Sequence, residues 1–394
     1  MDLSDSPAEA VFRAELRAWI EANCPDELRG GGDARDQHAV ETVSRRWMGA
    51  LAGAGYAGLT WPVDCGGQGL SQVYGAILLE ELARAADPPH IGLVGLNMCG
   101  PTLIAFGSEA QQRRHLPALL AGEEIWCQGF SEPGAGSDLA ALRTRADIRG
   151  DRIVLDGQKV WSSFAHAADF CLLLARSDPG STGNRGLTML ILDMHAPGVE
   201  VRPIRQLTGE PEFNEIFLTG VELPVDTVIG PVGEGWRVAM TTLLHERGTL
   251  GVALTAGLEY NVARLIELAC LEDGDGHRAA DDPLVRDRIA RELVELAALR
   301  ATNLRALSNL VDSGVPGPEG SVVKLRWSEA NRRVTALGQE LLGVDGLLAG
   351  ADAPLGAFWQ YQQLRSLGNT IEAGTSEVLR GIIAERVLGL PRSR

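Results

Sequence analysis

Cysteine motifs and basic clusters are missing from this sequence, and their absence excludes several classes of protein. The six cysteines lie far apart and none forms a Cys-x-x-Cys pair, so the sequence predicts buried thiols, with neither a zinc site nor a disulfide framework. The 36 basic residues are outnumbered by 52 acidic residues, which gives a formal net charge of −16. This charge argues against nucleic acid or an anionic membrane surface as a partner.

Long apolar runs and one metal-binding helix motif are also missing. No apolar run reaches the roughly 18 residues that a membrane span needs. The opening residues, Met1 to Asp5, lack the basic start of a targeting peptide. No Glu-x-x-His pair occurs, which excludes a di-iron carboxylate bundle, and no other metal site is expected. We therefore expect a cytoplasmic protein with no membrane association.

The hydrophobic pattern divides the chain into three successive parts and predicts an α+β fold that is mostly α. A chain of 394 residues with 45% hydrophobic residues is expected to form two or three packed units. We predict an N-terminal all-α domain over residues 1–123, a small middle β-barrel or β-sandwich domain over 124–233, and a C-terminal four-helix bundle over 234–394.

Local signals place the individual elements. Ser6-Pro-Ala-Glu9 is a capping box that begins the first helix. In the middle domain, short apolar or alternating runs between Gly, Pro and Asp turns indicate strands. The expected helices cover about 40–55, 72–86, 109–121, 236–272, 283–313 and 320–343, with a final helix from Thr375 or Ser376, and the expected strands include Arg152–Leu155, Phe170–Ala175, Leu187–Leu192 and Asn214–Leu218.

The segment Trp126–Asp138 is the strongest functional signal. It is too polar and glycine-rich for a strand interior, and Pro133 with the two glycines that follow lets the backbone turn and approach a ligand. Ser131 and Ser137 supply hydroxyl groups. The spacing lacks the third glycine of the dinucleotide fold. Taken alone, the segment is equally compatible with an ordinary turn.

Two further motifs follow, Gly157–Ser163 around Trp161 and Ile371–Arg380 near the C-terminus. In this order and spacing, the three motifs resemble the acyl-CoA dehydrogenase family. The pairs Trp61-Pro62, Gly66-Gly67 and Asn214-Glu215 stand near the expected places and extend the resemblance over nearly the whole chain.

The resemblance implies that FAD lies between the β-domain and the C-terminal helices. Trp161 would form an apolar wall for the flavin ring, and the Ser131 and Ser163 hydroxyls would donate at its edge. On residue chemistry alone, a tryptophan is more often a core residue. The implied cofactor contacts are Gln128, Phe130, Ser131, Trp161, Ser163 and Thr375, the last at a helix N-terminus, and the implied contact near the thioester is Ser137.

The family also requires a glutamate as base, and here the sequence departs from many relatives. The residue before Gly-Thr-Ser is Ala373, which cannot accept a proton, and its neighbour Glu372 is expected to be a solvated loop residue. Another branch, which includes bacterial enzymes of the FadE type, carries the base in a Glu-Arg pair on the first helix of the C-terminal bundle. Glu246 and Arg247 match that pair, so we expect Glu246 to be the base and Arg247 to orient the helix or contact CoA.

The residues that share a helix face with Glu246 are uncharged. A carboxylate on such a face is either paired across an interface or partly desolvated, and partial desolvation makes it a stronger base toward a carbon acid. The pattern alone therefore also fits a structural salt bridge. The residues on this face are Ala239, Thr242, Leu243, Thr249, Leu250 and Ala253.

We therefore predict an FAD-dependent acyl-CoA dehydrogenase that forms trans-2-enoyl-CoA and passes electrons to an electron transfer flavoprotein. The family segments that bind the adenosine end of FAD from a neighbouring subunit are not present in their usual form, so a homo-oligomer and a heterotetramer with a homologous subunit both stay open. Ala373 keeps open a partner subunit that donates FAD contacts without activity of its own, and an oxidase on the same fold is a third alternative. The sequence also does not determine the length or branching of the acyl chain, whether the acyl group carries a ring, or whether the thioester carrier is CoA or a carrier protein.

Overall fold

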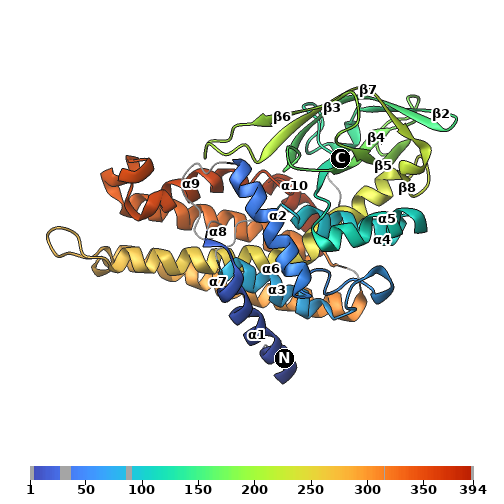
Figure 1. Ribbon diagram of the computed structural model, residues 1–394. Coiled ribbons are helices and arrows are strands. Elements are labelled where there is room, and N and C mark those ends of the chain that lie inside the picture. The colour runs from blue at the N-terminus through green and yellow to red at the C-terminus, as the bar shows by residue number, and fades with distance from the viewer. Residues whose placement is uncertain (1–3, 27–36, 86–90, 315, 392–394) are drawn as a thin grey trace. The chain divides into compact units, whose positions relative to one another are not determined.

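The computed structural model describes residues 4–26, 37–85, 91–314 and 316–391, with the side chains of 37–40, 245–250 and 351 outside the description. Contacts divide the chain into two compact units (Figure 1). The sheet unit contains α2 (Gln37–Gly53), α4 (Gly100–Phe106), α5 (Glu109–Ala121), all strands and the start of α6 (Gly235–Cys270). The helical unit contains α1 (Pro7–Asn23), α3 (Gln72–Arg84), the rest of α6, α7 (Pro283–Ser313), α8 (Glu319–Leu341), α9 (Phe358–Asn369) and α10 (Ser376–Ile382).

The order of elements confirms the predicted α+β fold, with helices, then strands, then helices along the chain. The boundaries at 123/124 and 233/234 stay a prediction from the sequence. No helix in the described ranges is both long and apolar enough to cross a membrane.

All strands belong to one mixed sheet in the order β6-β7-β3-β2-β4-β5-β8, with β1 parallel to β4. The antiparallel pairs β3·β7 and β4·β5 form its longest ladders. The strands are β1 (Trp126–Gly129), β2 (Arg145–Arg149), β3 (Arg152–Ser163), β4 (Phe170–Arg176), β5 (Leu187–Asp193), β6 (Val199–Ile204), β7 (Phe213–Pro224) and β8 (Val228–Ile229).

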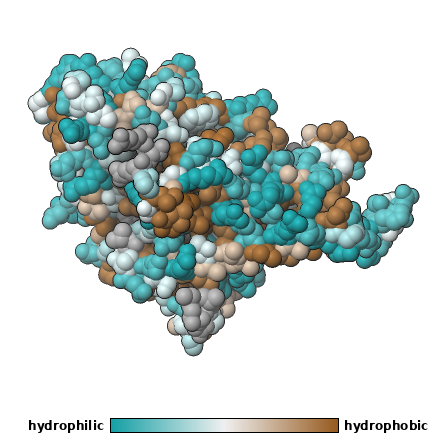
Figure 2. Space-filling view, turned by 180° about the vertical axis from the view of Figure 1, so that it is seen from behind, coloured by the Kyte–Doolittle hydropathy of each residue, from teal (hydrophilic) through white to brown (hydrophobic). Residues whose placement is uncertain are grey.

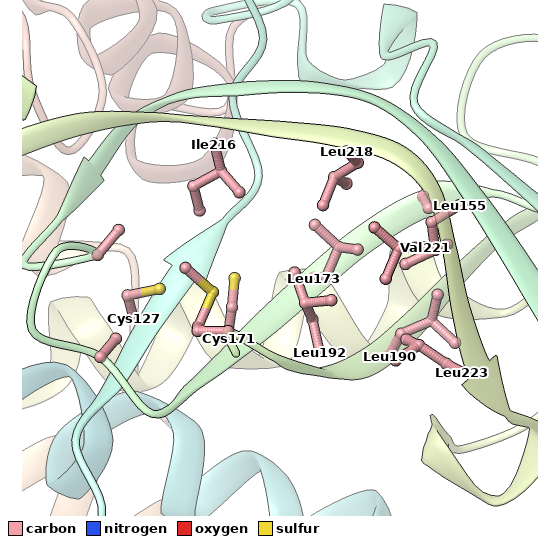
Figure 3. Packing of buried hydrophobic residues seen from close by; sticks show 14 of the residues in the cluster. Cys127, Leu155, Cys171, Leu173, Leu190, Leu192, Ile216, Leu218, Val221 and Leu223 are labelled. Atoms are coloured by element: carbon pink, nitrogen blue, oxygen red, sulfur yellow. The ribbon is translucent and has the colours of Figure 1, made fainter. Parts of the chain in front are cut away.

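Strand β4 is buried on both faces, which explains its continuous apolar sequence. Cys171 and Leu173 belong to one core cluster, and the alternate residues Leu172 and Leu174 belong to a second cluster that includes side chains of α4 and α5. In the first cluster, Ile216 and Leu218 of β7 point toward side chains of β4 and β5 (Figure 3). The sheet therefore curls over its own core, as expected of the middle domain.

Local capping signals correctly mark where several helices begin. The Ser6 hydroxyl accepts a hydrogen bond from the Glu9 N–H at 3.4 Å, and the Glu9 carboxylate accepts one from the Ser6 N–H at 2.7 Å, so the predicted capping box is confirmed. Asp282 caps α7 through the Leu284 N–H at 2.8 Å.

Helix α9 is missing from the sequence prediction. Its residues, Phe358–Asn369, are largely polar, and only Phe358, Trp359, Ser366 and Asn369 are buried. Trp359 packs against α8 so closely that a Cβ on Gly338 would lie 2.1 Å from its ring. The burial of Trp359 against Gly338 depends on the tertiary structure, so the spacing of apolar residues in α9 gives little indication of a helix.

Two expectations from the sequence were wrong. Trp126–Gly129 forms the buried strand β1, although the motif was expected to be unsuited to a strand interior, because β4 satisfies its backbone groups in parallel register. Not all cysteines are buried thiols. Cys270 is exposed at the end of α6 and Cys65 is half-buried, whereas Cys24, Cys99, Cys127 and Cys171 are buried.

Candidate active site

Strand β1 leads into a tight turn that presents the predicted flavin-contact residues. Phe130 is buried and Ser131 is half-buried. Glu132 and Ala135 exchange backbone hydrogen bonds of 3.1 and 3.0 Å, which closes the turn. Ser137, the predicted thioester contact, is exposed beyond it.

Trp161 lies at an irregularity of β3. The register between β3 and β7 shifts between Lys159 and Ser162, and Trp161 takes a left-handed backbone conformation with φ of 61°. Its side chain is 58% exposed, with the ring edge-on to Phe213 at a centroid distance of 6.0 Å. Trp161 is therefore not a core residue. An exposed indole in a strained backbone conformation is a mark of a functional position.

The two predicted flavin-contact segments lie side by side. The Val160 N–H donates to the Ser131 carbonyl oxygen at 2.9 Å, which ties β3 to the turn after β1. The Gln128 amide Nε2 is buried and has no hydrogen-bond partner in the described part of the chain. The sheet unit thus brings Ser131 beside Val160, the residue before Trp161.

Asn214 holds the backbone just before Ser163. It is fully buried, and its amide donates to the Ser162 carbonyl oxygen at 3.1 Å and to the Glu212 carbonyl oxygen at 2.9 Å. The same amide group lies 3.1 Å from His166 Nδ1. Burial lowers the pKa of His166. The asparagine therefore fixes the end of β3.

Beneath the turn, Lys159 and Glu132 form a buried ion pair that the sequence analysis missed. The Lys159 side chain is 0% exposed and its Nζ lies 2.9 Å from Glu132 Oε1 and 3.0 Å from the Phe130 carbonyl oxygen. The available signal was a lysine within a strand that also carries the buried apolar residues Leu155 and Val160. Its partner, Glu132, belongs to the segment Trp126–Asp138.

The helical unit contains a tight turn of its own, before Thr375. Ala373 has φ of 50° and Gly374 has φ of 95°, and Lys324 Nζ donates to the Gly374 carbonyl oxygen at 2.7 Å. A positive φ at alanine is uncommon and points to a constrained position. Thr375 caps α10 by accepting from the Val378 N–H at 3.2 Å, and the Ser376 N–H donates to the Thr370 carbonyl oxygen. The predicted helix start at Thr375 or Ser376 is confirmed. The Thr375 hydroxyl already accepts one hydrogen bond within the chain.

Glu372 is not the solvated loop residue that the sequence suggested. Arg365 binds both of its carboxylate oxygens, at 3.2 and 3.0 Å, and the Asn369 amide donates to it at 2.8 Å. Asn331 and Asn261 continue this chain of hydrogen bonds at 2.9 Å each. The carboxylate is half-buried because tertiary contacts gather these partners around it.

The side chains of Glu246 and Arg247 lie outside the described residues, although both positions belong to helix α6. One turn before Glu246, Thr242 is fully buried, and its hydroxyl lies 2.9 Å from the hydroxyl of Thr102 on α4. Ala239 is also fully buried. Part of the predicted uncharged face is therefore packed within the sheet unit.

One small residue further along α6 serves helix packing. A Cβ on Gly251 would lie 2.7 Å from Asn303 Oδ1 of α7, and the Asn303 amide donates to the Gly251 carbonyl oxygen at 3.1 Å.

Nearby, a cavity of about 290 Å³ lies among α1, α3, α6 and α7. None of the described site residues lines it.

The residues of the sheet unit fit a flavin ring. An exposed indole offers a flat apolar wall, and the half-buried hydroxyls of Ser131 and Ser163 with the unpaired Gln128 amide offer neutral hydrogen-bonding groups at an edge. Neutral donors beside an aromatic face are the chemistry that a flavin requires.

Family models match nearly the whole chain. The models described as "Acyl-CoA dehydrogenase, N-terminal domain", "middle domain" and "C-terminal domain" match residues 6–123, 127–221 and 233–388. The chain therefore belongs to the acyl-CoA dehydrogenase family, and it is an oxidoreductase of that family.

Relatives resemble the chain over its full length. It is 43% identical over 390 residues to the acyl-CoA dehydrogenase IpdE1 of Mycobacterium tuberculosis, with 97% of each chain covered. Among solved structures, the ChsE4-ChsE5 complex from Mycobacterium tuberculosis is 31% identical with a TM-score of 0.88, and the Tcur3481-Tcur3483 steroid ACAD is 31% identical with a TM-score of 0.86. Both comparisons cover 100% of each chain.

Proposed function

We propose that this chain is the catalytic subunit of an FAD-dependent acyl-CoA dehydrogenase that converts an acyl-CoA to the trans-2-enoyl-CoA. Bound FAD supplies the acceptor for the hydride that leaves the β-carbon, and an electron transfer flavoprotein receives the electrons. Glu246 takes the α-proton. Ser131, Ser163, Gln128 and Thr375 hydrogen-bond or contact the cofactor, and Phe130 and Trp161 line its ring. Ser137 and Arg247 contact the thioester and CoA.

The exposure of Trp161 carries this proposal. A large aromatic ring that is 58% exposed, on a backbone in a left-handed conformation and beside a hydroxyl-bearing turn, presents a flat apolar face to a ligand. Contact with a flat heteroaromatic ring accounts for the exposure, the strain and the neutral polar neighbours together.

The choice of Glu246 as base is supported by the other glutamate near the C-terminal motif. Arg365 and Asn369 bind Glu372, so both of its carboxylate oxygens already accept hydrogen bonds within the turn. Ala373 has no proton acceptor. Removing the α-proton therefore falls to the carboxylate on α6.

Exposed apolar residues support an assembly with further subunits. Within the helical unit, several large apolar side chains near the C-terminal elements are exposed, and Figure 2 shows hydrophobic surface in several separate areas of the molecule. We propose a heterotetramer with a homologous subunit, or a homo-oligomer. The side chains are Val344, Leu347, Ile371, Leu388 and Leu390.

The substrate is tested by anaerobic titration of the purified protein with short, long, branched and sterol-derived acyl-CoAs. Sterol-derived thioesters come first, because a similar structure is a steroid ACAD. Bleaching of the bound flavin by one class supports the proposal and gives the acyl group. A protein that co-purifies with no flavin, alone or with a homologous subunit, contradicts it.

Ala373 supports the alternative of a partner subunit that donates FAD contacts without activity of its own. Glu246→Gln separates the two. For a catalytic subunit, flavin reduction by substrate slows by about 10²–10⁴-fold, the usual contribution of a general base. An unchanged rate of reduction in the Glu246→Gln complex favours the non-catalytic subunit. Rapid aerobic peroxide production during turnover would favour an oxidase.

A further inference from the structure

The carbonyl groups around Ser131 are held from two sides. The Phe130 carbonyl oxygen, which precedes Ser131, accepts from Lys159 Nζ at 3.0 Å. The Ser131 carbonyl oxygen accepts from the Val160 N–H at 2.9 Å. Lys159 and Val160 are consecutive residues of β3, so one strand fixes the carbonyl groups before and after the Ser131 α-carbon.

Glu132 connects this arrangement to the rest of the sheet unit. Its carboxylate accepts from Lys159 Nζ at 2.9 Å, from the Arg143 N–H at 2.7 Å and from the Thr144 N–H at 2.8 Å. The chain leading to β2 and the middle of β3 are thus joined through one carboxylate. The Lys159 stem also packs beside Gly129, where an added Cβ would lie 3.6 Å from Lys159 Cγ.

A buried ion pair is not needed simply to fill a hydrophobic core. Two apolar side chains of similar volume are often equally or more stabilising, because each charge loses its hydration. Burial lowers the pKa of Lys159, against the opposing effect of Glu132. Burial also works against ionisation of Glu132, but Lys159 and the hydrogen bond from Thr144 hold its pKa below the ordinary value. What apolar side chains cannot supply is the directed hydrogen bond to the Phe130 carbonyl oxygen.

We propose that Lys159 and Glu132 act as positioning residues, holding the Phe130–Ser131 segment in the conformation that binds the flavin. This inference rests on the proposed function. Lys159 directly precedes the irregular stretch of β3 that carries Trp161, and Glu132 directly follows Ser131. The pair therefore couples the aromatic wall to the hydroxyl-bearing turn, and neither residue needs to touch the cofactor.

The test compares the double variant Lys159→Met/Glu132→Gln with the wild type, each purified with any subunit that accompanies it. The double variant removes both charges together and keeps the side-chain volumes, so no buried charge is left unpaired. The matched control is Glu124→Gln, which alters another buried carboxylate of the sheet unit, bonded to His115 and Trp126 at 2.9 and 3.1 Å. Protein is freed of flavin, and the FAD Kd and the visible absorption spectrum of rebound flavin are measured.

The expected result is an FAD Kd raised about tenfold or more in the double variant, with a shifted visible absorption band, and a Kd within about twofold of wild type in Glu124→Gln. A folded double variant with wild-type Kd and spectrum overturns the inference and leaves the proposed function intact. If the double variant does not fold, Lys159→Met alone decides, because it removes the Lys159–Phe130 bond while the Glu132 carboxylate keeps its hydrogen bonds from the Arg143 and Thr144 N–H groups. An unchanged Kd and spectrum in that variant also overturn the inference. A wild-type protein that binds no flavin refutes the proposed function, and the inference with it.

Discussion

Arg365 binds both carboxylate oxygens of Glu372, at 3.2 and 3.0 Å, within the helical unit. Arg365 lies in α9 and Glu372 in the turn that follows it, and Asn369 at the end of the same helix adds a third hydrogen bond at 2.8 Å. Glu372 is adjacent to Ala373, where many relatives carry the base. The hydrogen bonds from Arg365 and Asn369 indicate that Glu372 is a structural residue that fixes the turn before Thr375.

Glu372→Gln is therefore expected to lower stability and to leave proton abstraction working. A charged hydrogen bond to Arg365 is lost, which costs about 1.5–3 kcal/mol in the free energy of unfolding. Urea unfolding measures this cost, and the rate of anaerobic flavin reduction measures catalysis. A drop in that rate comparable with the drop in Glu246→Gln would identify Glu372 as the base.

Trp161→Ala is expected to weaken flavin binding with little effect on the fold. The side chain is 58% exposed, so the free energy of unfolding of the flavin-free protein should change by less than about 0.5 kcal/mol. The FAD Kd should rise about tenfold, since an aromatic contact and its buried area are lost. Leu207→Ala is the control, because Leu207 is also exposed in the sheet unit. Equal effects of the two substitutions would remove Trp161 from the flavin site.

Acid should destabilise the helical unit through Glu81. This carboxylate is buried beneath Arg13 and Arg17, at 2.9 and 2.7 Å. Burial alone would raise its pKa, but the hydrogen bonds from the two guanidinium groups lower the pKa below the ordinary 4.5. Its ionised form is thus favoured in the folded state, so the stabilisation is present above pH 4.5 and is lost as the pH falls through the lowered pKa.

Urea unfolding of the flavin-free protein across the acid range checks this. Glu81→Gln should cost about 3 kcal/mol at pH 7, and its stability should fall less steeply on acidification than that of the wild type. Glu109→Gln is the control, because Glu109 forms an exposed pair with Arg113 and should cost less than about 1 kcal/mol. Parallel acid profiles of wild type and Glu81→Gln would show that Glu81 does not carry the dependence.

Two glycines within helices of the helical unit should respond in opposite directions to alanine. A Cβ on Gly338 of α8 would lie 2.1 Å from the Trp359 ring, which is buried, so Gly338→Ala should destabilise by about 3 kcal/mol. A Cβ on Gly257 of α6 meets nothing within 4 Å among the described residues, so Gly257→Ala should stabilise by about 0.5–1 kcal/mol. Thermal or urea unfolding measures both, and destabilisation by Gly257→Ala would contradict the packing around α6.

The sequence by itself determined the features that depend on neighbours along the chain. The capping box at Ser6 and Glu9 and the cap at Thr375 are satisfied within one helical turn, so their positions follow from local chemistry. The apolar run of β4 predicted a strand because Cys171–Ala175 are buried on both faces of the sheet. The cofactor site around Trp161 stays a prediction that rests on resemblance to the family.

Only the tertiary structure decided which groups meet across long stretches of chain. Lys159 and Glu132 are 27 residues apart, and nothing in the local pattern shows that a buried lysine finds that carboxylate. Arg365 lies close to Glu372 in sequence, but whether that carboxylate faces solvent or a guanidinium depends on how α9 ends. Exposure of Trp161 depends on a register shift against β7. The Lys159–Glu132 pair and the exposure of Trp161 depend on pairing between distant segments, and the surroundings of Glu372 depend on the path of the chain after α9. The local sequence pattern determines none of these.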